Sequence, residues 1–458
     1  MITTTIVNLV LAAAPSGEAL QNSPAVPAPT AQVLPSSKGV FDRPMTPDQS
    51  ESGLEAHELS AGDPFEDMVE SFKQFRSIES PDGGFRLNSD LWLTQDYFVF
   101  DRPPPALIQT GESQTYWPSL SGLLSMEIGE HFSFVALGQV YRGFDPVDLS
   151  PNANLDEYFA VVKPFDTDAL ILKGGTFATC YGQWVNRHFS FQSPLINAPY
   201  MYEGMTSISD GAGNVTASPT RTRLIGRKDS ADPVTKWVPI IWGPSYTSGG
   251  QIAGTVQNID YAVEVKNASL SSRPSNWEFW DKSFQYPTVT ARLGWRPDAA
   301  WNLGVSGSRG NYLTSSPTIT ATAQKNDGIQ SVVGTDISYA HGSVELWGEF
   351  AWSQWQVPYA ENLSGYSVSA YSYFIEGKWK FAPQFWLAGR WNQQLYGDID
   401  NPAGGTTSWD NDVWRIDACI GWKIDRFVQF KTQYSYIGQD YGKQQGSNLF
   451  AIQLVVEF

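Results

Sequence analysis

The chain has few cysteines, few histidines and no long apolar run. Of its 458 residues, two are Cys and four are His, and no spacing typical of a zinc or haem site occurs. No run of eighteen apolar residues follows the N-terminal segment, which excludes a transmembrane helix. Basic residues are also scarce, since 30 Lys and Arg stand against 47 Asp and Glu, and this argues against nucleic-acid binding. No metal site and no cofactor are expected.

The histidines are the candidate catalytic bases, and their positions do not favour catalysis. His57 falls in a polar N-terminal stretch, and His131 and His341 fall in short turns. None of the four, His188 included, is matched with a Gly-flanked Ser in the way that a nucleophile and its base require. The sequence therefore does not predict an enzyme.

Strand patterns dominate the chain from Gly84 onward. Each segment has about ten residues of period-two alternation, and long connections alternate with short ones such as GEHF, QNID and AHGS. We count sixteen segments: 84–95, 117–129, 131–143, 155–165, 169–179, 248–257, 260–269, 287–296, 301–310, 329–340, 343–354, 367–381, 384–397, 412–424, 426–438 and 447–458. This arrangement predicts an all-β fold, a sixteen-stranded antiparallel transmembrane β-barrel over residues 84–458.

The second face of the segments distinguishes a barrel from a soluble β-sandwich, which would bury the same apolar faces. In 412–424, Trp414, Ile416 and Ile420 alternate with Arg415 and Asp417. Charged residues recur on this face in segment after segment, so the enclosed space must be wet. The expected lumen wall comprises the bases Arg292, Arg296, Arg390, Arg415 and Lys431 and the acids Glu345, Glu349, Glu376 and Asp417. Acids and bases segregated across the lumen would create a transverse field.

The last segment, SNLFAIQLVVEF, ends the chain on an aromatic residue. The alternate residues Phe450, Ile452, Leu454, Val456 and Phe458 share one fully apolar face. This ending resembles the last strand of bacterial outer-membrane β-barrels. The resemblance implies an outer-membrane location, contact with lipid, and the barrel assembly machinery as a partner.

The longest connection, about residues 180–247, follows the fifth segment, and loops of this length are uncommon unless functional. In sixteen-stranded porins the loop after the fifth strand narrows the pore, so the chain resembles that family. Its start, with GTF at 175–177 and CYG at 180–182, is similar to phosphate-selective-porin-like proteins, although the family's Pro is absent and Lys173 lies earlier than their Lys. The resemblance implies passive diffusion of small hydrophilic solutes or ions, and it allows a homotrimer.

Basic residues in this loop bear on selectivity. The expected constriction comprises Arg187, His188, Arg221, Arg223, Arg227 and Lys228. Inside the lumen these residues would favour anions, because guanidinium groups replace the lost hydration of an anion. Outside it they would be solvated and unspecific, and both interpretations stay open. The alternative function is a structural sheath or a docking platform for a periplasmic partner.

The N-terminal part does not continue the strand pattern. Residues 1–14 resemble a truncated signal peptide, and residues 15–62 are rich in Pro, Ser, Ala and acids, which predicts a disordered linker. Residues 63–80 are predicted to form an amphipathic helix and a lead-in, since Asp63 can cap it and Pro64 suits its first turn. The helix would brace or plug the periplasmic mouth, mediate trimer contacts, or pack against the rim. Cys180 and Cys419 could form a disulfide in an envelope protein.

Overall fold

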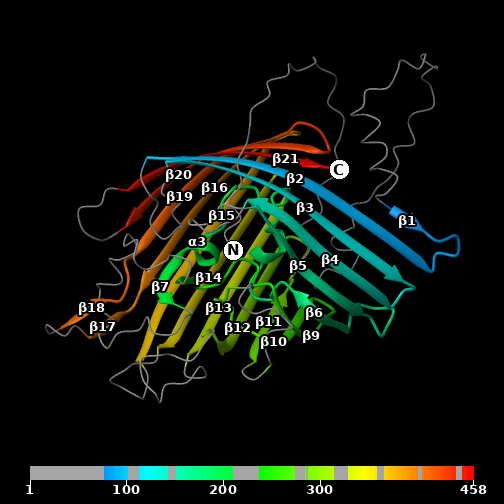
Figure 1. Cartoon of the computed structure of the whole chain (residues 1–458), viewed down its shortest axis with the longest axis horizontal. Coiled ribbons are helices and arrows are strands. Elements are labelled where there is room, and N and C mark those ends of the chain that lie inside the picture. The colour runs from blue at the N-terminus through cyan, green and yellow to red at the C-terminus, as the bar shows by residue number, and fades with distance from the viewer. Residues whose placement is uncertain are drawn as a thin grey trace, which may run out of the picture.

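The computed structural model shows a closed antiparallel β-barrel (Figure 1). It describes residues 77–101, 113–142, 151–209, 237–273, 284, 287–313, 328–357, 366–400, 405–439 and 446–458. The barrel strands are β2 (Phe85–Phe100), β3 (Gln114–Ile128), β4 (Phe132–Arg142), β5 (Pro151–Val162), β6 (Ile171–Phe177), β9 (Thr247–Val256), β10 (Ile259–Lys266), β11 (Thr288–Trp295), β12 (Trp301–Asn311), β13 (Ile329–His341), β14 (Val344–Val357), β15 (Tyr366–Ala382), β16 (Phe385–Tyr396), β19 (Val413–Lys423), β20 (Val428–Gln439) and β21 (Ser447–Glu457).

These strands are the sixteen segments that the sequence predicts, with ends shifted by a few residues. Each barrel strand pairs with the next along the chain, and β21 closes the barrel by pairing with β2, for example Leu93 with Val456. The short strand β1 (Ser77–Glu79) lies beside β2. The signal-peptide remnant, the linker and the helix expected at 63–76 lie outside the described residues. Among those that are described, no helix is long and apolar enough to cross a membrane.

The barrel is apolar outside and polar inside. On β15, Ile375 is 63% exposed, whereas the neighbouring Glu376 is fully buried. On β19, Ile416 and Ile420 face out, and Arg415 and Asp417 face the lumen. A continuous apolar outer band is unfavourable in water and favourable in lipid, and a closed barrel leaves no unpaired backbone edge there. The outer face is therefore the lipid-facing one.

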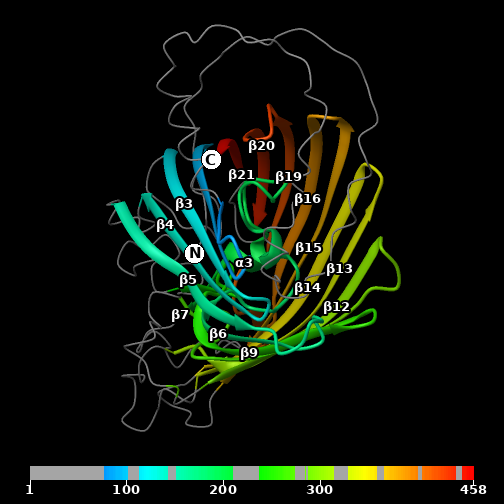
Figure 2. The ribbon, with the colours of Figure 1, turned by 90° about the vertical axis from the view of Figure 1, so that its right-hand side faces the viewer.

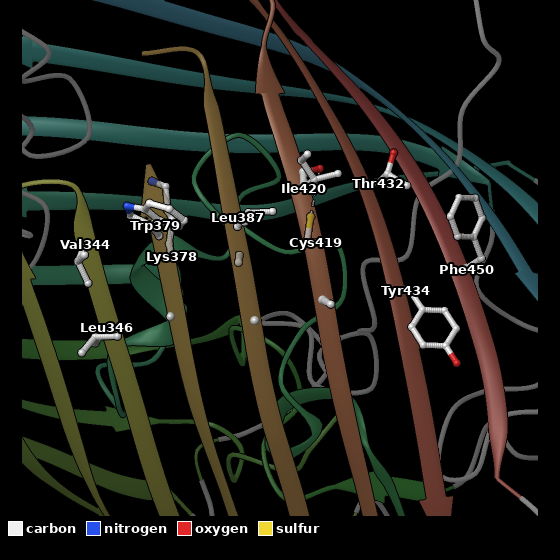
Figure 3. Close-up of a pocket in the computed structure, with 14 residues that line it drawn as sticks. Val344, Leu346, Lys378, Trp379, Leu387, Cys419, Ile420, Thr432, Tyr434 and Phe450 are labelled. Atoms are coloured by element: carbon white, nitrogen blue, oxygen red, sulfur yellow. Dashed lines mark hydrogen bonds between the residues drawn. The ribbon is translucent and has the colours of Figure 1, made fainter. Parts of the chain in front are cut away.

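Aromatic pairs mark the two borders of this outer band. Phe385 and Trp422 stack near the short turns, with ring centroids 5.7 Å apart, and Trp391 and Trp414 stack toward the other mouth at 5.5 Å. Trp414 and Trp422 are about 27 Å apart along β19, which suits the thickness of an outer-membrane apolar band once the strand tilt is included. Between the borders, a shallow groove is lined mostly by apolar side chains such as Leu346, Leu387 and Ile420 (Figure 3).

The connection from β6 to β9 folds into the barrel. Its described elements are the 3-10 helix η1 (Trp184–Arg187), the helix α3 (Tyr200–Glu203), and the strands β7 (Met205–Ser209) and β8 (Trp237–Pro239). Figure 2 shows α3 between the β3–β5 wall and the β14–β16 wall. Loop and wall side chains share an apolar cluster that includes Trp184, Met201, Tyr202, Trp347, Trp355 and Phe374. The wet lumen expected from the strand pattern is thus partly a packed core, because the loop brings its own apolar residues inside.

Candidate functional site

Arg415 on β19 holds the loop against the wall. Its guanidinium donates to Glu203 on α3, to Asp417 at 2.9 Å on its own strand, and to the carbonyl oxygen of Ala198. It also lies over the Tyr200 ring, 4.6 Å from the centroid. Burial raises the pKa of Glu203, and the charge of Arg415 opposes that rise. A buried charge needs such a complete set of partners to be tolerated.

Arg390 on β16 forms a second attachment beside the first. It donates to Asp417 at 3.0 Å, to Glu376 at 3.1 Å, and to the carbonyl oxygen of Asn197 at 2.6 Å. Glu376 also accepts a hydrogen bond from Arg187 of η1, whose guanidinium lies over the Trp347 ring. Loop and wall are joined here by a continuous chain of alternating charges.

Two further wall residues complete the attachment. Glu349 on β14 accepts from the backbone N–H groups of Gln183 at 2.7 Å and Trp184 at 2.6 Å, and from the Tyr202 hydroxyl. The Lys431 ammonium on β20 donates to the carbonyl oxygens of Ser190 and Ser193. The loop from 183 to 203 is therefore fixed to the wall formed by β14, β15, β16, β19 and β20.

All nine wall residues expected from the sequence lie on lumen-facing positions or at a lumen-side strand end. Their charges are mostly paired rather than gathered in separate rows, because antiparallel register puts acid beside base: Glu376 opposes Arg390, and Arg390 opposes Asp417. The same holds away from the loop, where ion pairs join Arg292 to Asp336, Arg296 to Asp260, and Lys378 to Glu345.

The expected constriction residues divide into two groups. Arg187 and His188 lie in the inward-folded loop, with Arg187 turned to the wall. Arg221, Arg223, Arg227 and Lys228 lie outside the described residues, so their place in or out of the lumen stays a prediction. Cys180 and Cys419 are both free thiols.

A small pocket lies between the loop and the wall formed by β21 and β2–β5, and we call this pocket the passage. Its volume is about 40 Å³, enough for roughly three water molecules. Hydroxyl and amide groups dominate the wall side, whereas the loop side contributes neutral rings. The lining comprises Trp92, Thr94, Ser119, Ser121, Gln139, Asp156, His188, Phe189, Ser190, Ser193, Ile196, Pro244, Tyr246 and Gln453. Thr94 and Ser190 bridge wall and loop at 3.0 Å.

His188 is neutral at physiological pH in this setting. Its Nδ1 donates to the carbonyl oxygen of Val185, and its Nε2 accepts from the Tyr246 hydroxyl at 2.6 Å. Burial lowers its pKa to about 4. The loop side of the passage therefore gains no positive charge from His188 near pH 7.

We expect His188 to stay uncharged when the pH falls from 7 to 5, because both values lie above its lowered pKa. The ratio of channel conductance at pH 7 to that at pH 5 should then be the same for the unaltered chain and for His188→Gln. Planar-bilayer recordings at both pH values measure it. A conductance step near pH 6.5 that disappears in the variant would contradict the expectation.

The sequence pattern missed several lumen residues that take part in these contacts. Glu203 belongs to the loop, where strand periodicity gives no information. Asp96 on β2 and Asp156 on β5 are buried lumen carboxylates. A signal for Asp156 was present: outward residues fall on odd numbers up to Leu155 and on even numbers from Tyr158, and such a change of parity indicates a β-bulge.

No family model and no curated protein matches this chain. Among solved structures, it is similar to OprB of Pseudomonas putida, with a TM-score of 0.52 and 12% identity, over 86% of this chain and 97% of that one. It is also similar to the outer membrane channel DcaP of Acinetobacter baumannii, with a TM-score of 0.52 and 12% identity, over 83% of this chain and 99% of that one. The TM-score is again 0.52 for an anion-selective porin from Comamonas acidovorans, with 7% identity, over 82% of this chain and 100% of that one. At these identities the likeness is one of fold. The likeness supports a porin-like barrel fold for this chain.

Proposed function

We propose that this protein is a bacterial outer-membrane porin, which lets small hydrophilic solutes or ions diffuse passively across the membrane. The observation that supports it most is the attachment of the loop to one wall by buried charged residues. Arg390, Arg415 and Lys431 hold the loop to one wall, and a small polar space is left between the loop and the opposite wall. A loop that merely filled the barrel would need no hydroxyl-lined face opposite it.

Planar-bilayer recording with the purified full chain tests this function. We expect stepwise conductance from protein that migrates as a folded, heat-modifiable barrel, and none from the same sample after boiling. Folded barrels that give no conductance steps at any salt concentration would overturn the proposal.

The anion preference and the phosphate-selective resemblance are finer proposals. They depend on Arg221, Arg223 and Arg227 lying in the lumen, where local charge outweighs charges more than about 8–10 Å away. We expect the triple change to Glu to shift the reversal potential in a salt gradient toward cations. Replacing chloride by phosphate in the same recordings tests the solute.

Arg426→Glu is the matched control for this triple variant, because Arg426 lies in an exposed turn between β19 and β20. An unchanged reversal potential in the triple variant would place those arginines outside the conducting path, and the anion preference would have to be abandoned.

One alternative function stands beside the porin function. A sheath around a periplasmic partner is the weaker alternative, because the wall-attached loop occupies the space that such a partner would need. We propose no reaction for the chain, since His188 is engaged by Val185 and Tyr246 rather than by a serine.

Assembly as a homotrimer and recognition by the barrel assembly machinery are also proposed, and chemical cross-linking in outer-membrane vesicles tests the trimer.

A further inference from the structure

A β-bulge on β5 turns two consecutive carboxylates into the lumen. Strand β4 pairs Leu137 with Glu157 and then Gly138 with Leu155, so Asp156 is the extra residue. Asp156 and Glu157 are both nine-tenths buried on the lumen side, whereas Leu155 is 56% exposed on the outer face. Bulges commonly re-aim a side chain beside a functional site.

The two carboxylates have different surroundings. Glu157 accepts from the backbone N–H of Ala178 at 2.7 Å and is attracted by Lys173 on β6. Asp156, in contrast, lines the passage, and no basic side chain among the described residues forms an ion pair with it. Two polar, uncharged residues, Ser121 and Gln139, are in register with each other on β3 and β4 and line the same space.

Most other charges of the described lumen are compensated. Arg415, Arg390 and Arg187 share Glu203, Asp417 and Glu376. Lys431 is surrounded by carbonyl oxygens and is attracted by Asp96, and Lys266 lies 4.0 Å from Glu264. Glu349 is satisfied by N–H and hydroxyl donors on the loop side. Among the described residues that line the passage, Asp156 is thus the carboxylate.

We propose that Asp156 and the oxygen atoms around it form a binding site for a small inorganic cation, such as K⁺ or Na⁺, within the passage. This inference rests on the proposed porin function and names the ion that the described part of the pore favours. Hydroxyl, amide and carboxylate oxygens are the ligands that hard cations accept in place of hydration water. Ser119, Ser121 and Gln139 supply them on the same wall.

The passage also fits a cation by size and by the charge of its far side. A space for roughly three waters admits a partly hydrated ion, and larger solutes would require the 188–196 segment to move. The loop side presents neutral His188, Phe189 and Tyr246, and none of the lining residues is a lysine or an arginine. The Lys431 ammonium lies behind this lining, where the carbonyl oxygens of Ser190 and Ser193 accept its hydrogen bonds. An anion would meet Asp156 without a compensating base.

Asp156→Asn tests the site, because it removes the charge and keeps the shape. In planar bilayers under a KCl gradient, we expect the ratio of cation to anion permeability to fall about fivefold, since a unit charge some 4 Å from an ion is worth about that factor even in a water-like dielectric. Asp156→Glu should retain the preference. Asp166→Asn, in the exposed turn after β5, is the control and should leave the ratio unchanged.

The unaltered chain gives a second, independent measurement. A binding site makes K⁺ conductance saturate as the KCl concentration rises, whereas a simple water-filled pore gives a linear increase. Linear conductance, or an unchanged permeability ratio in a folded Asp156→Asn barrel, would overturn the cation site while the porin function stands. Folded barrels of the unaltered chain that conduct nothing would instead remove the porin function itself.

Discussion

A chain that lacks residues 447–458 is expected to form no stable barrel. Strand β21 pairs with β20 on one side and with β2 on the other, so its loss opens the sheet. Two strands would then present unpaired N–H and C=O groups to lipid, and each such group costs several kcal/mol. Heat-modifiable migration and outer-membrane fractionation measure the result, and we expect both to be lost.

Leu454→Val is the matched control for this deletion, because it shortens one lipid-facing side chain and leaves all backbone pairing intact. It should assemble as the unaltered chain does. Normal heat-modifiable barrels from the truncated chain would show that closure through β21 is not needed, and the assignment of this strand as the closing one would fail.

Replacing Arg415 by Ala is expected to release the constriction loop and to raise the single-channel conductance severalfold. The change leaves Glu203 and Asp417 buried without their shared partner. Breaking a buried ion pair in this way costs about 3–5 kcal/mol. Because the barrel wall is held by its own backbone pairing, we expect that cost to be relieved by detachment of the loop rather than by unfolding of the barrel.

Protease sensitivity provides a second measure of Arg415→Ala, since a detached loop should be cleaved between residues 178 and 246 while the barrel stays heat-modifiable. Arg309→Ala is the control, as Arg309 faces outward on β12 and donates to Ser331 at 2.7 Å. Unchanged conductance together with an intact loop would mean that the remaining contacts of Arg390, Glu349 and Lys431 suffice to hold it.

Strand positions could be predicted from the sequence because each strand meets two different solvents. Residues such as Ile416 face lipid and residues such as Asp417 face the lumen, so apolar and polar residues alternate along the sequence with a period of two. The same alternation assigned Arg390, Arg415 and Lys431 to the lumen.

The partners of these residues could not be predicted, because they depend on register and on the path of the loop. Arg415 and Glu203 lie 212 positions apart, and no local pattern connects them. The packed half of the lumen was missed for a related reason. Trp347 and Trp355 share the lumen face of β14 with Glu345 and Glu349, and the apolar loop side chains that cover them are visible only in three dimensions.

The attachment of the loop to late strands has a consequence for the order of assembly. The loop follows β6, whereas Glu376, Arg390, Arg415 and Lys431 belong to β15, β16, β19 and β20. During synthesis the loop is made long before the strands whose charged side chains hold it, and contacts between residues so far apart in the sequence form late. The constriction can therefore be locked only once the C-terminal half of the wall is in place, so that a barrel becomes narrow at about the time it becomes closed.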